Sequence, residues 1–426
     1  MKTKITLLVF FACSIWACAP SERSEQKVEE VAKVETKASI SEGSWRAVLT
    51  LKNGIELPFN FTVALDGKGE PKIDIINGEE KLSLDEVKIW KDSISIPMHI
   101  FDAEIIGKLQ GGKITGKWVK HSYKKPYEIP FKAVAGVNHR FDDGGIAPMA
   151  NITGKWQVSF ENEEGDPDQA IGVFEQKGSK LLGTFLTTTG DYRYLEGSVI
   201  GNELHLSCFD GEHAFLFTAK LDNGLITDGM FYSGKHWEQP WTAIVNENAS
   251  LPDAGKLTYL KDGYDKVAFS FPNLDGEPVS LEDQRYKGKV VVVQLLGSWC
   301  PNCMDETKFL APFYQQYQPK GFEVIGLAYE RNPEFNEAKK RVSVMKDKLG
   351  VDYEVLIAGV SSKVEAAKSL PMLNHVMSFP TTIIIDKTGE VRKIHTGFSG
   401  PGTGEYYQKF VDEFTLTIEK LLAEEA

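Results

Sequence analysis

The sequence has few cysteines, and it has no long hydrophobic run beyond its first residues. Only five cysteines occur in 426 residues, which excludes a small fold held together by many disulfides. No segment after Ala17 is long and apolar enough to cross a bilayer as a helix. Basic residues are outnumbered: the formal net charge is -12, whereas a nucleic-acid-binding surface needs a basic stripe. We therefore expect no nucleic-acid partner.

The first residues have the layout of a secretory signal peptide. Two lysines precede an apolar run that ends at Ala17 and is too short to span a bilayer. The run leads into Ile15-Trp16-Ala17-Cys18, which resembles the lipobox of bacterial lipoproteins except that Trp16 replaces the usual small residue. We expect a signal peptide at 1–17 and a lipid anchor on Cys18, hence attachment to a membrane of the bacterial cell envelope, facing the periplasm or the cell surface. A plain secreted precursor is the alternative.

Residues 18–42 differ in composition from the segments on either side. They are rich in Ser, Glu and Lys and contain few large apolar side chains, so they cannot bury enough surface to fold. We expect a flexible tether here. The total length then leaves room for roughly two to four domains.

Residues 43–245 consist of short alternating runs broken by Gly, Asn and Asp, which is typical of antiparallel β structure. Part of the pattern occurs twice, in the same order, at a nearly constant offset of 110 to 112 residues. The matched segments begin at Gly43 and Gly154, Ile94 and Leu204, Lys108 and Lys220, and Pro130 and Pro240. This order indicates an internal duplication. We expect two repeated all-β modules, each a small barrel or sandwich, at 43–135 and 152–245, with a linker at 136–151.

Each module opens with G-x-W, which resembles the start of calycin-type barrels. We interpret Trp45 and Trp156 as core residues and the modules as rigid spacers, because small barrels usually fill their interiors with side chains. A cavity for a ligand is the alternative. Cys208 lies on the apolar side of a predicted strand, where we expect a buried small hydrophobic residue rather than a reactive thiol.

The chemistry of the chain is concentrated in Gly297-Ser298-Trp299-Cys300-Pro301-Asn302-Cys303. This stretch follows the apolar run Val290–Leu296 and precedes Met304–Tyr317, whose composition suits a helix. The pattern predicts a strand, a tight turn and a helix N-terminus. Cys300 would cap the helix, where free backbone N–H groups and the positive dipole end favour a thiolate. Cys303 lies one helical turn further on, close enough for a disulfide.

The last 160 residues or so resemble the TlpA/ResA-like thiol-disulfide oxidoreductases of the thioredoxin superfamily. Trp299-Cys300-Pro301-Asn302-Cys303 after an apolar strand carries the resemblance, together with Phe379-Pro380-Thr381-Thr382 about 80 residues later. Residues 269–281 look like the family's entry hairpin. The resemblance implies an α/β thioredoxin-like domain at 262–426, after a linker at 246–261, with a strand-helix insertion before Pro380.

The resemblance also implies a mechanism and a set of site residues. Cys300 would be the nucleophile and Cys303 the resolving cysteine of a redox-active disulfide, which needs neither a cofactor nor a metal. Trp299 would shield the sulfurs, although a core role for its ring is nearly as well supported. Phe379 and a cis Pro380 would bind a substrate segment through backbone groups. The expected partners are disulfide-containing envelope proteins and a membrane electron donor, with reduction as the favoured direction.

Glu306 is the candidate for the acid-base role. Thioredoxins carry a buried Asp six residues before the first cysteine, but this chain has Gln294 there, which cannot titrate. Glu306 follows Cys303 by one helical turn, and ResA-like members have a Glu at this place. An exposed carboxylate stabilised by the helix dipole is an equally supported alternative. We expect its neighbour Asp305 to matter little.

Other functions fit the sequence less well. A structural zinc site would need two more ligands, and His375 and His395 lack the usual short spacing. A copper carrier using both thiols and His375 is rarer still. A peroxiredoxin-like peroxidase would not carry a second cysteine three residues after the first. The rival class is a binding protein, whose β modules hold a glycan, a lipid or a protein partner while the redox domain is accessory.

Overall fold

The computed structural model describes residues 39–122, 127–141, 144–162 and 165–425. The expected signal peptide, Cys18 and nearly all of the expected tether lie outside the described residues. Within these ranges no helix has the length and apolar character needed to cross a membrane.

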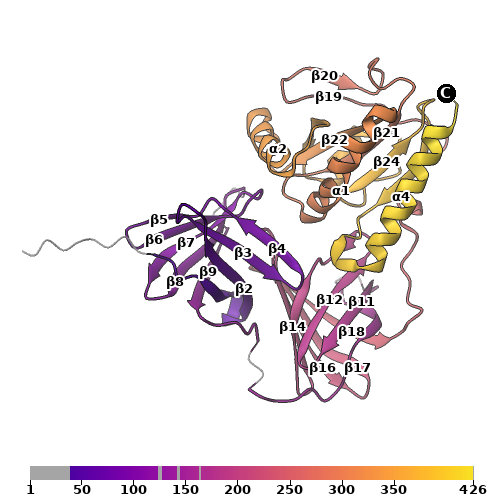
Figure 1. Ribbon diagram of the computed structural model, residues 1–426. Helices are drawn as coiled ribbons and strands as arrows, with labels where there is room; N and C mark the ends of the chain where they lie inside the picture. The colour runs from indigo at the N-terminus through magenta and orange to yellow at the C-terminus, as the bar shows by residue number, and fades with distance from the viewer. Residues whose placement is uncertain (1–38, 123–126, 142–143, 163–164, 426) are drawn as a thin grey trace, which may run out of the picture. The chain divides into compact units, whose positions relative to one another are not determined.

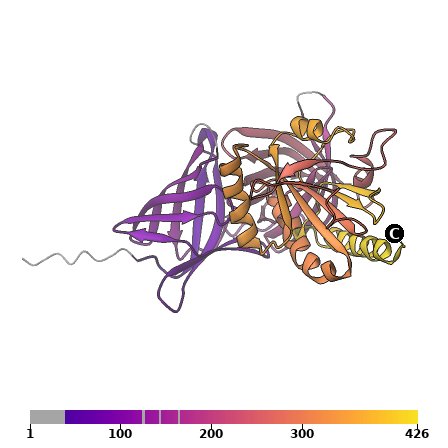
Figure 2. The same ribbon diagram turned by 90° about the horizontal axis from the view of Figure 1, so that it is seen from above.

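The first sheet has nine antiparallel strands in the order β4-β3-β2-β1-β9-β8-β7-β6-β5. They are β1 (Gly43–Thr50), β2 (Glu56–Leu65), β3 (Pro71–Asn77), β4 (Glu80–Leu84), β5 (Lys88–Trp90), β6 (Ser93–Pro97), β7 (Ala103–Gln110), β8 (Lys113–Lys120) and β9 (Tyr127–Ala135). Figure 2 shows these strands, in indigo and purple, as one curved sheet. Among the described residues β4 and β5 do not pair, so the sheet is a half-barrel and not the closed barrel or sandwich that we expected.

The second sheet also has nine strands, and the additional pairing of β11 with β12 closes it into a barrel, as expected. They are β10 (Gly154–Phe160), β11 (Asp168–Lys177), β12 (Lys180–Thr187), β13 (Gly190–Asp191), β14 (Leu195–Ile200), β15 (Glu203–Phe209), β16 (Ala214–Asp222), β17 (Leu225–Ser233) and β18 (Trp237–Val245) (Figure 1). Closure satisfies the backbone groups that an edge strand would leave unpaired.

Along the strands of both sheets, apolar side chains alternate with polar ones, so the apolar side chains lie together on the inner face of each sheet. Trp45 and Trp156 are both buried, and each indole N–H donates to a carbonyl four residues earlier, Ser41 O and Ile152 O, at 2.9 Å. Their prediction as core residues is confirmed. Cys208 is also buried, and burial raises the pKa of its thiol well above the usual value, as expected of an unreactive cysteine.

The third sheet has the order β23-β22-β21-β24-β25 and is flanked by helices. Its elements are β21 (Val290–Leu296), α1 (Pro301–Tyr317), β22 (Phe322–Glu330), α2 (Phe335–Leu349), β23 (Glu354–Val360), α3 (Lys363–Ser369), β24 (Thr381–Ile385), β25 (Val391–Thr396) and α4 (Glu405–Ala423). A short hairpin, β19 (Ser270–Pro272) and β20 (Pro278–Ser280), precedes them. Every residue of β21 and β22 is buried, because apolar clusters lie on both faces of the sheet. The 3-10 helices are η1 (Lys52–Gly54), η2 (Ala254–Lys256), η3 (Gln318–Lys320) and η4 (Pro401–Thr403).

The segment expected as a linker at 246–261 is packed in its second half. Thr258 is fully buried, and its backbone N–H donates to Thr396 Oγ1 on β25 at 3.1 Å. Leu260 forms an isolated bridge with Leu373. These residues are therefore tied to the third sheet.

Candidate active site

The two cysteines lie where β21 ends and α1 begins. Cys300 is the N-cap residue of α1, and its Sγ accepts a hydrogen bond from the backbone N–H of Cys303 at 3.2 Å. Pro301 occupies the first turn, where a missing N–H costs nothing. Cys300 and Cys303 form a disulfide with their Cα atoms 5.2 Å apart. Cys303 is completely buried and Cys300 is 5% exposed, so Cys300 is the less deeply buried of the two cysteines.

The Phe379–Pro380 peptide bond is cis, as the resemblance implies, and it faces the disulfide. Cys300 Sγ lies 3.5 Å from Phe379 O. Residues 80 positions apart thus meet because β24, which follows Pro380, pairs directly with β21. The backbone around Pro380 supplies polar groups beside the reactive sulfur.

Trp299 forms one wall of the site. Its indole N–H donates to Tyr329 O at 2.8 Å, its ring contacts the Phe379 ring edge-on at 5.9 Å, and the guanidinium of Arg331 lies 5.2 Å from its centroid. A cavity of about 340 Å³ adjoins this wall, lined in part by Trp299 and Arg331. The half-buried ring therefore packs against its neighbours and borders this cavity, and its shielding of the sulfurs stays a prediction.

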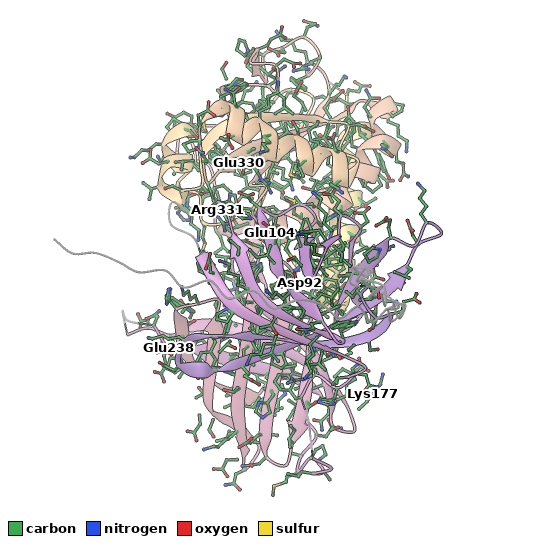
Figure 3. The ribbon with its side chains drawn as sticks, turned by 90° about the vertical axis from the view of Figure 1, so that its left-hand side faces the viewer. Asp92, Glu104, Lys177, Glu238, Glu330 and Arg331 are labelled. Atoms are coloured by element: carbon green, nitrogen blue, oxygen red, sulfur yellow. A yellow bond between two sulfur atoms is a disulfide. The ribbon has the colours of Figure 1, made fainter. Side chains whose placement is uncertain are left out.

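The turn before Cys300 is held by a carboxylate. Glu330, at the end of β22, accepts hydrogen bonds from the backbone N–H and the hydroxyl of Ser298, both at 2.7 Å. Glu330 and Arg331 are labelled in Figure 3. Burial raises the pKa of Glu330, although Ser298 and nearby arginines counteract this.

Glu306 is buried in the interior and is not the exposed first-turn carboxylate that we kept as an alternative. Its two oxygens accept hydrogen bonds from Gln294 Nε2 at 2.7 Å and from Thr382 Oγ1 at 2.5 Å. Burial raises the pKa of Glu306 to about 7, against the opposing effect of these two hydrogen bonds. A buried carboxyl group with a raised pKa therefore lies one helical turn beyond Cys303.

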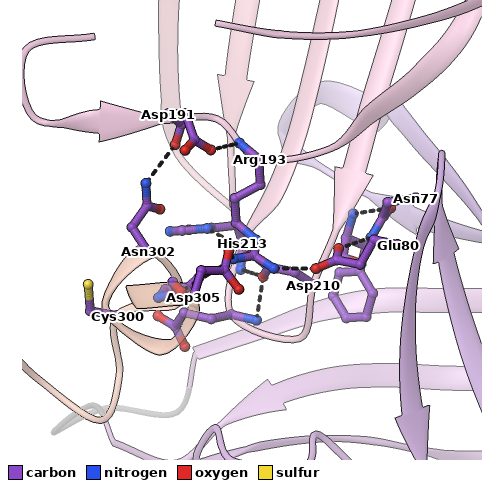
Figure 4. Close-up of polar contacts among 12 residues, drawn as sticks. Asn77, Glu80, Asp191, Arg193, Asp210, His213, Cys300, Asn302 and Asp305 are labelled. Atoms are coloured by element: carbon purple, nitrogen blue, oxygen red, sulfur yellow. Dashed lines mark hydrogen bonds and ion pairs between the residues drawn. The ribbon is translucent and has the colours of Figure 1, made fainter. Parts of the chain in front are cut away.

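Asp305 makes a buried contact that the sequence does not predict. It is buried, and its carboxylate forms an ion pair with Arg193, whose guanidinium also donates to Pro301 O at 3.3 Å. Figure 4 shows this contact beside Cys300. Its partner lies more than 100 residues earlier in the chain, which is why the sequence does not indicate this ion pair; that Asp305 matters little for the dithiol chemistry stays a prediction.

Arg193 is the centre of a buried charge cluster that the sequence did not predict (Figure 4). It forms ion pairs with Glu80, Asp305 and Asp210, the last at 3.2 Å. Burial lowers the pKa of Arg193, but the three carboxylates together raise it well above its usual value. Burial also acts to raise the pKa of Asp210, but His213 and Arg193 hold it well below the usual value. In the sequence, Arg193 stands in a polar stretch that reads as an ordinary turn.

Taken together, these residues can carry out reversible sulfur exchange. One sulfur lies at a helix N-terminus, its more deeply buried partner lies one turn away, and a carboxyl group with a pKa of about 7 can hold a proton nearby. Among the described residues no cluster of three or more His, Cys, Asp or Glu side chains is arranged to hold a metal ion.

Comparison with known proteins places the similarity in the C-terminal part of the chain. Residues 249–409 match the family model Redoxin. The thiol-disulfide oxidoreductase ResA of Halalkalibacterium halodurans is 29% identical over 135 residues, which are 32% of this chain and 68% of that protein. The thioredoxin-like protein YneN of Bacillus subtilis is 28% identical over 138 residues, 32% of this chain and 73% of that protein. A solved thiol:disulfide interchange protein of the thioredoxin family from Chlorobium tepidum is 21% identical, with 38% of this chain and 100% of that chain covered and a TM-score of 0.28.

Proposed function

The C-terminal region of this chain is a TlpA/ResA-like domain of the thioredoxin superfamily and a redox enzyme, and from that premise we propose that the protein reduces disulfides in other proteins. One observation carries the proposal: a Cys300–Cys303 disulfide at the start of α1, with Cys303 the more deeply buried of the two and a cis proline segment beside Cys300.

The proposed reaction is thiol-disulfide exchange. The Cys300 thiolate attacks one sulfur of a substrate disulfide, and the other sulfur leaves as a thiolate that takes up a proton. A mixed disulfide forms. Cys303 then loses its proton and attacks Cys300 Sγ, which releases the second substrate thiol. Two electrons and two protons pass to the substrate, and the Cys300–Cys303 disulfide remains.

Glu306 is proposed to hold the proton that leaves Cys303. Its pKa of about 7 allows it to gain or lose a proton near neutral pH, as a general base must. Its hydrogen bonds to Gln294 and Thr382 fix its orientation. Trp299, Phe379 and Pro380 are proposed to bind the substrate segment, with Trp299 shielding the sulfurs and the Phe379 backbone pairing with an extended chain.

We further propose that the enzyme acts in the bacterial cell envelope, anchored to a membrane through a lipid on Cys18. The sequence at 1–42 supports this part of the proposal. Because disulfides persist in such a compartment, a reductase there needs electrons from elsewhere, which we assign to a membrane donor. Its substrates would be disulfide-containing envelope proteins.

The two β sheets are proposed to be duplicated modules that support the redox domain. In both sheets the first strand pairs with the last, and both place the first tryptophan in the core. The interior of the second barrel is filled by packed aromatic rings, among them Phe160, Phe185, Phe217 and Trp241. This packing favours a structural role over a ligand cavity. The domain division at 43–135, 152–245 and 262–426 is part of the same proposal.

Substrate trapping tests the proposed function. Cys303→Ala leaves a mixed disulfide on Cys300 that cannot resolve, so envelope proteins should accumulate as covalent adducts of the full chain that a reductant releases. The matched control, in which both cysteines are alanine, should trap nothing. Equal adduct yields from the two variants would contradict the proposal.

A further inference from the structure

A hairpin of the second barrel lies against the candidate active site. Strands β12 and β13 pair through Leu186 with Asp191 and Thr187 with Gly190, which leaves a two-residue tip. Three hydrogen bonds join this hairpin to the redox domain. Asn302 Nδ2 donates to Asp191 O at 3.1 Å, Ser378 Oγ donates to Thr189 O at 2.7 Å, and the backbone N–H of Gly400 donates to Asp191 Oδ2 at 2.6 Å.

These three contacts fall on three segments of the redox domain: the first turn of α1, the loop before the cis proline and the loop after β25. Asn302 lies between the two cysteines, Ser378 immediately precedes the cis Phe379–Pro380 bond, and Gly400 follows β25. The loop after β25 is joined to the cis-proline segment, because the Gly397 N–H donates to Pro380 O at 2.9 Å. Figure 4 shows Asn302 extending from the start of α1 toward Asp191. An extended substrate segment would pair with the backbone of residues 378–380, which we call the Pro380 strip. The hairpin therefore occupies the position that such a segment would take.

The contact is closely fitted on both sides. Gly397 has φ +76°, and a Cβ there would lie 2.8 Å from the carbonyl carbon of Thr189. Gly190, on the hairpin, has φ +140°, and a Cβ there would lie 2.6 Å from Asn302 Nδ2. The hairpin and the redox domain thus each have a glycine at the point where the other comes closest, and a larger residue there would collide with it.

The residues that follow the hairpin are held in place by buried ion pairs. Arg193 follows β13 by two residues and forms the buried ion pairs with Glu80, Asp210 and Asp305 described above. Asp191 Oδ1 accepts a hydrogen bond from the Arg193 backbone N–H at 2.5 Å. Asp191 therefore connects the anchored base to the Gly400 loop.

We propose that the β12–β13 hairpin is a specificity element of the dithiol: it occupies the strip beside Pro380, so an extended protein substrate binds only by displacing it. This inference rests on the proposed disulfide reductase function. A small disulfide has no extended backbone to pair beside Pro380, so it needs only contact with Cys300 Sγ and does not have to displace the hairpin. Protein disulfides are thus selected by their ability to compete with the hairpin.

The Asp191→Asn variant of the full chain tests this inference. Whichever way the new amide turns, either the Gly400 or the Arg193 N–H loses its acceptor, which weakens the closed hairpin without changing its size. Reduction of insulin in the presence of dithiothreitol should become about tenfold faster, because opening costs less. Reaction with 2-hydroxyethyl disulfide should change less than about twofold. The control Asp222→Asn, at an exposed site on the same barrel, should match the wild type in both assays.

An unchanged or slower insulin reaction in a folded Asp191→Asn chain would overturn the inference. Hydrogen exchange gives a second test that does not use the Asp191→Asn variant. In Cys303→Ser carrying a peptide as a mixed disulfide on Cys300, amides 187–193 should exchange faster than in the peptide-free chain, and unchanged protection there would also overturn it. If the wild type fails to react even with 2-hydroxyethyl disulfide, the proposed function fails instead.

Discussion

At the scale of single residues, the site depends on what burial does to neighbouring carboxyl groups. Glu306 and Asp305 are adjacent in the sequence and look alike there, but the helix turns them toward different neighbours. Glu306 contacts uncharged donors, and burial raises its pKa to about 7. Asp305 pairs with Arg193. The sequence could nominate Glu306 by its spacing from Cys303, whereas the role of Asp305 depends on a residue from another sheet.

The raised pKa of Glu306 predicts a pH-dependent stability. Ionising the carboxyl group costs more in the folded chain than in the unfolded one, so the contribution of Glu306 to stability is fully present below about pH 4.5 and is lost as the pH rises to about 7. The shift corresponds to about 3 kcal/mol. Urea unfolding of the oxidised chain at several pH values should show this loss in the wild type, and Glu306→Gln should reduce the fall between pH 4.5 and 7 by about this amount. The same pH dependence in Glu306→Gln would contradict the assignment, and the exposed control Asp412→Asn should follow the wild type.

Glu306 should also influence the reactive thiol. A negative charge near the sulfurs disfavours the thiolate, so Glu306→Gln should lower the apparent pKa of Cys300 in the reduced chain. Ultraviolet absorbance of the thiolate, followed against pH, measures this directly. Superimposable titrations of the wild type and Glu306→Gln would show that Glu306 is not coupled to the dithiol.

At the scale of elements, the strands and helices around the dithiol follow from the sequence. The apolar run Val290–Leu296 is β21, and the helix predicted over Met304–Tyr317 forms most of α1 (Pro301–Tyr317). These predictions succeed because local periodicity and capping decide them. The position of the β12–β13 hairpin could not be predicted, because it is fixed by contacts between residues more than 100 positions apart.

The start of α1 is held by the Arg193 ion pairs, and Asp305→Asn tests how strongly. The substitution keeps the shape of the side chain but removes one of three buried carboxylates from a cluster around a buried guanidinium. We expect a loss of about 3 kcal/mol in the free energy of unfolding at neutral pH. Denaturant unfolding measures it, with Asp412→Asn as the matched surface control. A loss equal to that of the control would mean that the ion pair contributes nothing to the fold.

At the scale of the whole molecule, the sequence separates a β-rich half from a redox domain, but it does not reveal how the two cooperate. Composition and the offset of the repeats indicate two β sheets, yet only the structure shows that the first is an open half-barrel and the second is closed. The closing pair, β11 with β12, leaves no special mark in the sequence. The contacts of Arg193 and of the hairpin make the second barrel part of the environment of the dithiol.

Single-turnover reduction shows whether Cys300 and Cys303 together perform two-electron disulfide exchange. The prereduced full chain, freed of excess reductant, would be mixed with 2-hydroxyethyl disulfide and the products analysed by mass spectrometry. The wild type should convert one disulfide into two thiols and end with a Cys300–Cys303 bond. Cys303→Ala should stop at a mixed disulfide on Cys300, and Cys300→Ser should form no such adduct at the wild-type rate. A wild-type chain that leaves the disulfide intact, or a first adduct on Cys303 or Cys208, would contradict the claim.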